Sequence, residues 1–381
     1  MIDIQKDFHP IKDKDGNETS PLAVSHANED AQNVVKNIIE KHIDQISHIT
    51  VTMDTHEVND IGHSNFWVRD DTMDKYFDEF ENSAGPIQPN DDNGDAEVGQ
   101  VDPKGVPLDE NFRDLKHPPP FSSIVYKKWE GLHGKKDYAF VGTSGPPDGS
   151  QKSTHFWTPK DASLRSYCAG YLKELQSSSG FNKLQHTIWP CHCLEGSEGH
   201  NVQDDYQKAF DKWSAVSGKD VFYVFKGTNR LCEMYSAFRA EVPVQGDYST
   251  YTNVDLIRRL RGRTDDPIVI AGQATGYSVR FTVEDLLRLW PVDSRTSAED
   301  LIKDAKINDQ KRKNFEQLSD LPHKDVLRRR IYLLEDGMSD IPSNVDGKEI
   351  GPGVIFKEKV RGTVNITTCD AMSKILSEPV V

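Results

Sequence analysis

The fold is decided by one stretch of the sequence, Ile268-Val-Ile-Ala-Gly-Gln-Ala-Thr-Gly-Tyr-Ser-Val279. Its apolar start predicts a buried strand, the Gly and Ala that follow predict a tight turn, and a helix is expected to begin near Ser278. Free backbone N–H groups and the positive end of the helix dipole gather at such a helix start. An α/β enzyme places a nucleophile and its oxyanion hole there, so Ser278 is the first candidate site residue.

The rest of the chain repeats this alternation of strand and helix. Helical spacing of apolar residues predicts helices over 28–45, 202–213 and 253–260, and again after Ser278. Strands are expected at 49–53, 221–225, 268–271, 331–334 and 363–366. Because several of these strands are apolar throughout, we predict an α/β fold with three layers, α/β/α, around a mostly parallel central sheet.

Two segments interrupt this rhythm within what we expect to be a single domain over 1–381. Residues 68–184 are rich in Asp, Asn, Gly and Pro and include the acidic run Asn90–Asp95, so we expect an insertion of which much is loop or locally mobile. Residues 291–325 are polar and charged and are interpreted as a helical insertion.

Composition limits the partners and the compartment. The chain has 381 residues and a formal net charge of -15, which argues against nucleic-acid and anionic-membrane partners. Five cysteines in a chain of this length do not form a disulfide framework. The start of the chain has no signal-peptide pattern and no apolar stretch is long enough to span a bilayer, so we predict a cytoplasmic protein. The sequence leaves open whether the protein forms a homo-oligomer.

Carboxylate and imidazole side chains form a first candidate site. Asp54 and His56 follow a predicted strand, and residues two apart in an extended chain point the same way. With His192 from a distant segment they suit Zn²⁺, or Mn²⁺ or Fe²⁺, with positions left open for water or substrate. Cys191 and Cys193 flank His192, and alternation predicts that their thiols point away from it.

A second candidate site combines Asp3, Lys226 and Ser278. Asp3 and Lys226 each end a predicted strand, and Ser278 follows another. The carboxyl ends of parallel strands host the active site in open α/β sheets. A carboxylate beside an ammonium group stays charged there and can take a proton from a nucleophile.

The motifs of the chain occur in the order that a known family has. They are Asp3-Ile-Gln-Lys-Asp-Phe8, Asp54-Thr-His56 with His63, Trp189-Pro-Cys-His-Cys193, Phe225-Lys-Gly227 with Tyr235-Ser-Ala-Phe238, Gly272–Val279 and Leu334–Ser339. Together they resemble the isochorismatase-like cysteine hydrolases and, within them, the nicotinamidases. The resemblance covers the chain except for the two insertions.

This resemblance implies roles for the site residues. Asp3 would be the general base, Lys226 its partner, and Ser278 would stand at the nucleophile position. The implied metal ligands are Asp54, His56 and His192, with His63 as a variable fourth ligand.

The resemblance also implies how a substrate is held. Phe8 and Trp189 would sandwich a small planar aromatic amide. Backbone N–H groups of Ala274 and Ser278 would form the oxyanion hole, beside a cis peptide bond at Gln273–Ala274.

The chain departs from the family pattern at three places. The family nucleophile is a cysteine, and a serine hydroxyl is much harder to ionise than a thiol. Asp3 is only the third residue, so the central strand is expected to be shortened to Met1-Ile2 or the chain to be a truncated version. The large insertion enters between His63 and Trp189, beside the expected metal site.

The expected function is therefore a nicotinamidase-like, metal-dependent amidohydrolase that Ser278 impairs. The chief alternative is a catalytically inactive homologue that binds a ligand or a protein. A Cys→Ser variant of an active enzyme is a third interpretation. A metal-free isochorismate-type hydrolase is disfavoured by Asp54, His56 and His192.

Overall fold

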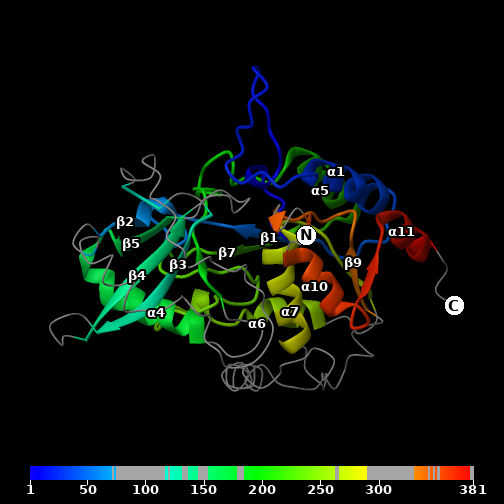
Figure 1. Ribbon diagram of the computed structural model, residues 1–381. Helices are drawn as coiled ribbons and strands as arrows, with labels where there is room; N and C mark the ends of the chain where they lie inside the picture. Colours follow the sequence, from blue (N-terminus) through cyan, green and yellow to red (C-terminus); the bar gives the residue numbers. More distant parts are fainter. Residues whose placement is uncertain are drawn as a thin grey trace.

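The computed structural model describes twelve parts of the chain, drawn in colour in Figure 1. They are residues 1–70, 73, 116–118, 121–130, 136–144, 153–177, 184–261, 266–289, 330–341, 344–345, 348–349 and 352–377. Within these ranges, no helix is both long and apolar enough to cross a membrane.

The centre of the molecule is a parallel sheet in two parts that the chain start joins. Strands β1 (Thr50–Asp54) and β7 (Phe222–Lys226) pair in parallel. Strands β8 (Ile268–Ile270), β9 (Ile331–Leu334) and β12 (Asn365–Thr367) form a parallel set in the order β12-β9-β8. Parallel strands need crossovers, and helices lie between them in sequence.

Ile2 lies between the two parts and bridges Thr52 on one side and Gly272 on the other, both in parallel. Its N–H donates to Ala271 O at 2.8 Å and its carbonyl accepts from Gln273 N at 2.8 Å. The order across the molecule is therefore β7-β1-(Ile2)-β8-β9-β12. The expected short central strand is present as single bridges at the position that a full strand would take.

Helices cover both faces of this sheet (Figure 1). On one face lie α1 (Ala27–Val34), which continues as the π-helical η2 (Val35–Glu40), α5 (Asp204–Ser217) and α11 (Cys369–Ser377). On the other lie α6 (Val254–Arg261), α7 (Arg280–Leu289) and α10 (Pro352–Val360). Each face has its own buried apolar cluster, so the predicted three-layer α/β/α architecture is confirmed.

Helix α5 shows how the sequence sets these elements. The Gln203 side chain accepts hydrogen bonds from the N–H groups of Asp205 and Tyr206 and so caps the first turn. Gly218 ends the helix in the left-handed conformation at φ 66°. Between them Tyr206 and Trp213 lie on one buried stripe against the sheet.

A second sheet lies beside the first and was not predicted. It is antiparallel, in the order β2-β5-β4-β3-β6, and α4 (Arg165–Ser177) packs against it. Its strands are β2 (Trp67–Arg69), β3 (Ser123–Glu130), β4 (Lys136–Ser144), β5 (Ser153–Pro159) and β6 (His186–Thr187).

The expectation that much of 68–184 is loop is wrong for the part that the structure describes, which is mostly strand and helix. Ile124, Phe140 and Trp157 are buried in an apolar cluster of this sheet. The high content of Asp, Asn, Gly and Pro in this segment obscured the alternation of buried apolar and exposed residues along its strands. The acidic run at 90–95 and the predicted helical insertion at 291–325 lie outside the described residues.

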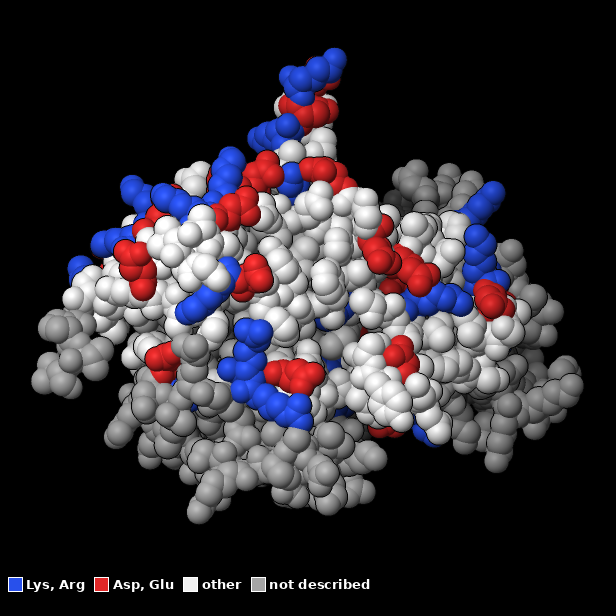
Figure 2. Space-filling view, turned by 180° about the vertical axis from the view of Figure 1, so that it is seen from behind, with Lys and Arg blue, Asp and Glu red and all other residues white. Residues whose placement is uncertain are grey.

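The remaining elements are short. They are η1 (Lys6–Phe8), η3 (Ser64–Phe66), η5 (Ala162–Leu164), η6 (Tyr248–Thr250), η7 (Thr275–Val279), β10 (Asn344–Val345) and β11 (Lys348–Glu349). Figure 2 shows the molecule from behind. On this face, acidic and basic side chains are interspersed among the described residues.

Candidate active site

Lys226 joins the residues predicted for the two candidate sites. It ends β7 and is 1% exposed, and its ammonium group lies 2.8 Å from Asp3 Oδ2 and 3.0 Å from Asp54 Oδ1. It also donates to the carbonyl of Met234 at 3.2 Å. The two predicted clusters are thus one site at the carboxyl ends of the parallel strands.

Burial and neighbouring charges shift the pKa values of these groups in opposite directions. Burial raises the pKa of Asp3, and the attraction of Lys226 only partly offsets this. Burial alone would lower the pKa of Lys226, but Asp3 and Asp54 raise it above its usual value. Burial would raise the pKa of Asp54, yet Lys226 and His56 hold it well below its usual range. Asp3 is therefore the more basic of the two carboxylates.

Ser278 faces this ion pair. Its hydroxyl oxygen accepts from the Lys226 ammonium at 3.4 Å, and the same ammonium lies 2.8 Å from Asp3 Oδ2. The helical backbone begins at Thr275, with Ala274 as its N-cap, so Ser278 lies inside η7 and not at the helix start as predicted. Residues that the sequence pattern assigned to a tight turn therefore form the first turn of the helix.

Asp54, His56 and His192 converge on one point beside Lys226. One ligand atom from each lies within 4.8 Å of the others, and all three residues are buried. His56 Nδ1 is 3.1 Å from Asp60 Oδ2, and His192 Nδ1 is 2.8 Å from the Pro190 carbonyl. Because each Nδ1 is held by an oxygen, the Nε2 atoms are the ones that face Asp54, at 3.2 and 3.5 Å.

His63 lies beside this group but is not one of the three residues whose ligand atoms converge. Its ring centroid lies 5.0 Å from that of His56 and 5.4 Å from that of His192. Its Nδ1 is 3.1 Å from the Glu57 carbonyl, and its buried Nε2 has no hydrogen-bond partner among the described residues. Burial, together with the charges on His56 and His192, lowers the pKa of His63 to about 3. A neutral imidazole with a free Nε2 is the form that binds a metal ion, so the residues present fit one.

A small pocket adjoins these residues. It holds about 20 Å³, roughly the room of one water molecule, and both Ser278 and Ala274 line it. Phe8 and Trp189, predicted to hold a substrate ring, also line it and are each 4% exposed. The peptide bond Gln273–Ala274 is cis, as the resemblance implied.

Three residues with ionisable side chains, to which the sequence assigned no role, also line the pocket. Tyr235 and Tyr277 pack edge-on around Trp189 at centroid distances of 6.3 and 4.9 Å. Glu233 is buried, and burial together with Asp60 raises its pKa to about 8. It lies two residues before the Tyr235–Phe238 stretch, and this closeness was the available signal.

The cysteines lie outside this pocket. All five are described, all are free, and none of them lines the pocket. Burial raises the pKa of Cys193 well above its usual value, and its backbone carbonyl accepts from the His56 N–H. Neither Cys191 nor Cys193 belongs to the group that could hold a metal ion.

The fold and this site define an α/β protein with an Asp-His-His candidate metal centre beside an Asp-Lys-Ser cluster. The chain is 32% identical to the nicotinamidase of Escherichia coli (strain K12) over 134 residues, 35% of this chain and 54% of that protein. The match thus spans about half the length of that curated relative. Over that part of its length the chain is similar to a nicotinamidase, the class that its motifs resemble.

Solved structures of nicotinamidases are also similar to the chain. A nicotinamidase–pyrazinamidase of Acinetobacter baumanii has a TM-score of 0.42 and 13% identity, covering 97% of this chain and 95% of that one. The yeast nicotinamidase has a TM-score of 0.43 and 15% identity, with 96% of each chain covered. No protein-family model matches the chain.

Proposed function

We propose that the chain is a metal-dependent amidohydrolase of nicotinamidase type, which converts nicotinamide or a similar small planar amide to its acid and ammonia. One observation carries the proposal: the Lys226 ammonium touches both Asp3 and the Ser278 hydroxyl while it borders the Asp-His-His group. A base, a nucleophile and an electrostatic partner therefore share one buried point.

The chemistry follows from these positions. Ser278 Oγ gives its proton to Asp3 and attacks the amide carbon, and the N–H groups of Ala274 and Ser278 hold the developing oxyanion. Ammonia leaves with the proton from Asp3. A water molecule deprotonated by Asp3 then releases the acid and restores Ser278. Lys226 keeps the carboxylate of Asp3 in place and charged through the cycle.

Phe8 and Trp189 orient the ring of the amide in this proposal. Asp54, His56 and His192 would hold a divalent transition metal, and His63 would be a variable fourth ligand. A set of imidazoles and one carboxylate suits zinc before manganese or iron. When bound, the metal supplies a Lewis-acidic anchor for a ring nitrogen or a water molecule.

The nucleophile limits the rate. A hydroxyl in place of a thiol raises the barrier by roughly 4 kcal/mol, about a thousandfold in rate. The specific alternative, a homologue that binds a ligand or a protein partner without turnover, is favoured by Ser278 and by the pocket of only about 20 Å³.

A paired assay separates the two functions. Ammonia release from a panel of aromatic amides is measured for the parent, Ser278→Cys and Asp3→Ala, with the metal content of each recorded. We expect slow release by the parent, a gain of at least about 100-fold in Ser278→Cys, and none in Asp3→Ala. Ser249→Cys, an exposed serine outside the site, is the matched control and should equal the parent.

Each other result has a definite meaning. An inactive parent with an active Ser278→Cys identifies a site disabled only at its nucleophile, which is also what a Cys→Ser variant of an active enzyme would give; the source gene decides between them. Metal-loaded protein that is inactive in both forms would overturn the hydrolase proposal in favour of the binding module. Activity in metal-free protein would restore the isochorismate-type interpretation.

A further inference from the structure

The two edge strands of the second sheet approach each other beside the candidate metal centre. In the order of that sheet, β2 and β6 are the outermost strands, with the other three strands between them. Trp67 begins β2 and His186 begins β6, yet their ring centroids lie only 5.9 Å apart. Tyr171 of α4 packs edge-on against His186 at a centroid distance of 5.7 Å. The second sheet therefore curves until its two edges meet.

One backbone carbonyl receives a hydrogen bond from each of these edge strands. Ile61 lies in the loop between β1 and β2, and its carbonyl oxygen accepts from Trp67 Nε1 at 2.8 Å and from His186 Nε2 at 2.7 Å. All three residues are fully buried. A carbonyl oxygen has two acceptor positions, so both positions of Ile61 O are filled. The second sheet thus holds this peptide group through both of its edges.

The contact also fixes which nitrogen of His186 carries the proton. A carbonyl can only accept, so the hydrogen is on Nε2, and burial lowers the pKa of His186 to about 4, which keeps the ring neutral. Nδ1 is buried and has no hydrogen-bond partner among the described residues. A phenyl group would fill the same space without leaving a nitrogen unpaired, so the imidazole indicates a role for this bond beyond packing.

Asp60, the residue before Ile61, orients a candidate metal ligand. Asp60 Oδ2 lies 3.1 Å from His56 Nδ1, and Asp60 Oδ1 accepts from the Gly62 N–H at 2.9 Å. Because His56 Nδ1 is held in this way, its Nε2 is the atom that faces Asp54, at 3.2 Å. A displacement of the Ile61 peptide would therefore reach His56 through Asp60.

The same loop borders the pocket. Gly62 O accepts from the Trp189 N–H at 2.7 Å, and His63 forms a parallel bridge with Trp189, which lines the pocket. A Cβ at Gly62 would lie 1.8 Å from Glu233 Oε1, so the loop is packed closely on this side as well. The position of the loop thus affects a wall of the pocket together with the metal ligands.

We propose that His186 is a positioning residue for the metal centre: its N–H fixes the Ile61 peptide, so that Asp60 holds the His56 ring in the orientation that binds a divalent cation. Trp67 supports the same carbonyl from the other edge strand. His186 acts through Ile61 and Asp60 and does not touch the cation. The inference rests on the metal binding of the proposed function, and it gives the second sheet a part in that binding.

The affinity of the full chain for Zn²⁺, measured by competition with a chromogenic chelator, tests this role. His186→Phe keeps the ring packing but removes the donor, and we expect Kd to rise at least about tenfold, the lower end for loss of a group that orients a metal ligand. His186→Gln keeps an N–H near the position of Nε2 and should bind within about threefold of the parent, since the hydrogen bond is kept. Equal affinity of His186→Phe and the parent would overturn the proposal.

The visible absorption of bound Co²⁺ separates positioning from a general loss of stability. The absorption bands depend on the ligands and on the geometry around the ion. At saturating Co²⁺ the bands of His186→Phe should therefore differ from those of the parent, and His186→Gln should restore them. Unchanged bands in His186→Phe would show that His186 supports only the fold and would overturn the proposal.

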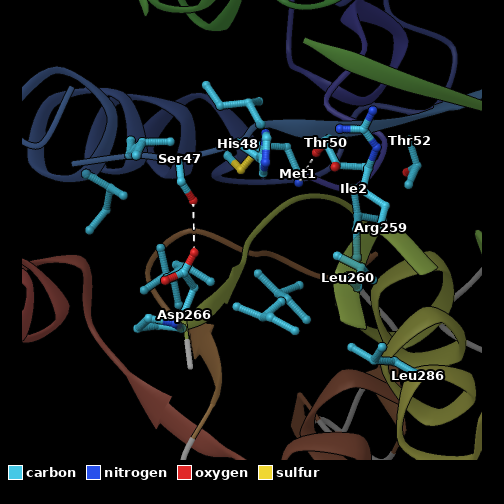
Figure 3. Close-up of a pocket in the computed structure, with 18 of the residues that line it drawn as sticks. Met1, Ile2, Ser47, His48, Thr50, Thr52, Arg259, Leu260, Asp266 and Leu286 are labelled. Atoms are coloured by element: carbon cyan, nitrogen blue, oxygen red, sulfur yellow. Dashed lines mark hydrogen bonds between the residues drawn. The ribbon is translucent and has the colours of Figure 1, made fainter. Parts of the chain in front are cut away.

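His42→Phe is the matched control for the loss of a buried histidine. His42 is 3% exposed, and its Nε2 lies 2.8 Å from Ser373 Oγ. It lines a separate cavity of about 310 Å³, near Met1 and Ser47 (Figure 3), which shares no lining residue with the pocket beside the metal centre. His42→Phe should leave the affinity for Zn²⁺ unchanged. An equal loss in His42→Phe and His186→Phe would overturn the proposal.

A second variant covers the case in which His186→Phe does not fold. Trp67→Phe removes the other donor to Ile61 O and keeps an aromatic ring, so the same loss of at least about tenfold is expected, and affinity equal to the parent would overturn the proposal. A parent that binds Zn²⁺ no better than Asp54→Ala would overturn the metal dependence of the proposed function and this inference with it. Tight binding by the parent and by both aromatic variants would overturn this inference alone.

Discussion

Lys226 holds two carboxylates together inside the protein. Asp3 comes from the chain start and Asp54 from the end of β1, and the ammonium lies within 3.0 Å of both. In water such contacts contribute little, but all three side chains are largely withdrawn from it. Removing one partner of a buried pair leaves an uncompensated charge, which costs far more than the pair contributes.

Lys226→Met should therefore destabilise the protein strongly. We expect the free energy of unfolding to fall by about 3–5 kcal/mol, because Asp3 and Asp54 are left buried without a cation. Urea unfolding at neutral pH measures this change in the free energy of unfolding. Lys212→Met, which breaks a surface pair with Glu40 at 3.1 Å, is the control and should change stability by less than about 1 kcal/mol. Equal effects of the two substitutions would contradict the buried arrangement.

Glu233 should make stability depend on pH. Burial raises its pKa in the folded protein to about 8, above its usual 4.5. A folded pKa above the unfolded one means that this contribution is fully present below about pH 4.5 and is lost as the pH rises to about 8. The loss amounts to at most about 5 kcal/mol.

The measurement is the free energy of unfolding between pH 5 and 9 for the parent and for Glu233→Gln. The amide has no proton to lose, so the variant should be flatter over this range. A parent profile that matches the variant would show that Glu233 ionises normally.

At the scale of elements, the turn after β8 requires a glycine. Gly272 has φ +132°, and a Cβ at this position would lie 1.9 Å from the carbonyl oxygen of Ile2. The close approach lets Ile2 bond to Ala271 and Gln273 and so join the two halves of the sheet. The turn residue thus determines whether the chain start reaches its central position.

Gly272→Ala should weaken the hydrogen bonds by which Ile2 joins the two halves of the sheet. We expect a loss of more than about 2 kcal/mol in unfolding free energy, since both the backbone angle and the contact with Ile2 become unfavourable. Gly170→Ala in α4 is the matched control: nothing lies within 4 Å of the added Cβ, and alanine should stabilise the helix by about 0.5–1 kcal/mol. Thermal unfolding compares the two, and a neutral Gly272→Ala would contradict the close approach.

At the scale of the whole molecule, the candidate metal centre links distant parts of the chain. Asp54 ends β1, His56 follows in the next loop, and His192 comes from a segment after the second sheet. An ion that binds only the folded arrangement stabilises it by mass action, by about 2.7 kcal/mol at a free concentration a hundredfold above Kd.

Added Zn²⁺ should therefore raise the melting temperature, and a chelator should lower it again. Binding should weaken as the pH falls, because Asp54 and Asp60 outweigh burial and raise the pKa of His56 well above its usual value, so a proton must leave before the metal binds. Zinc titrations at pH 6 and 8 test this direction. Asp54→Ala should abolish the stabilisation and His26→Ala should keep it; a pH-independent affinity would contradict the prediction.

Local patterns in the sequence determined the fold class and the kinds of residue in the site. Apolar runs predicted the parallel strands, and the ends of those strands predicted Asp3, Asp54 and Lys226, because polar residues after a buried strand fall at one edge of the sheet. The antiparallel sheet was missed because its alternation lies within a segment whose average composition resembles a loop.

Only the tertiary structure determined the distances between these residues. It merged two predicted clusters through Lys226, placed the Nε2 atoms of His56 and His192 beside Asp54, and set Glu233 near Asp60. The physical reason is that contacts between segments far apart in the chain depend on how strands and helices pack, whereas periodicity along the chain reports only which face of each element is buried.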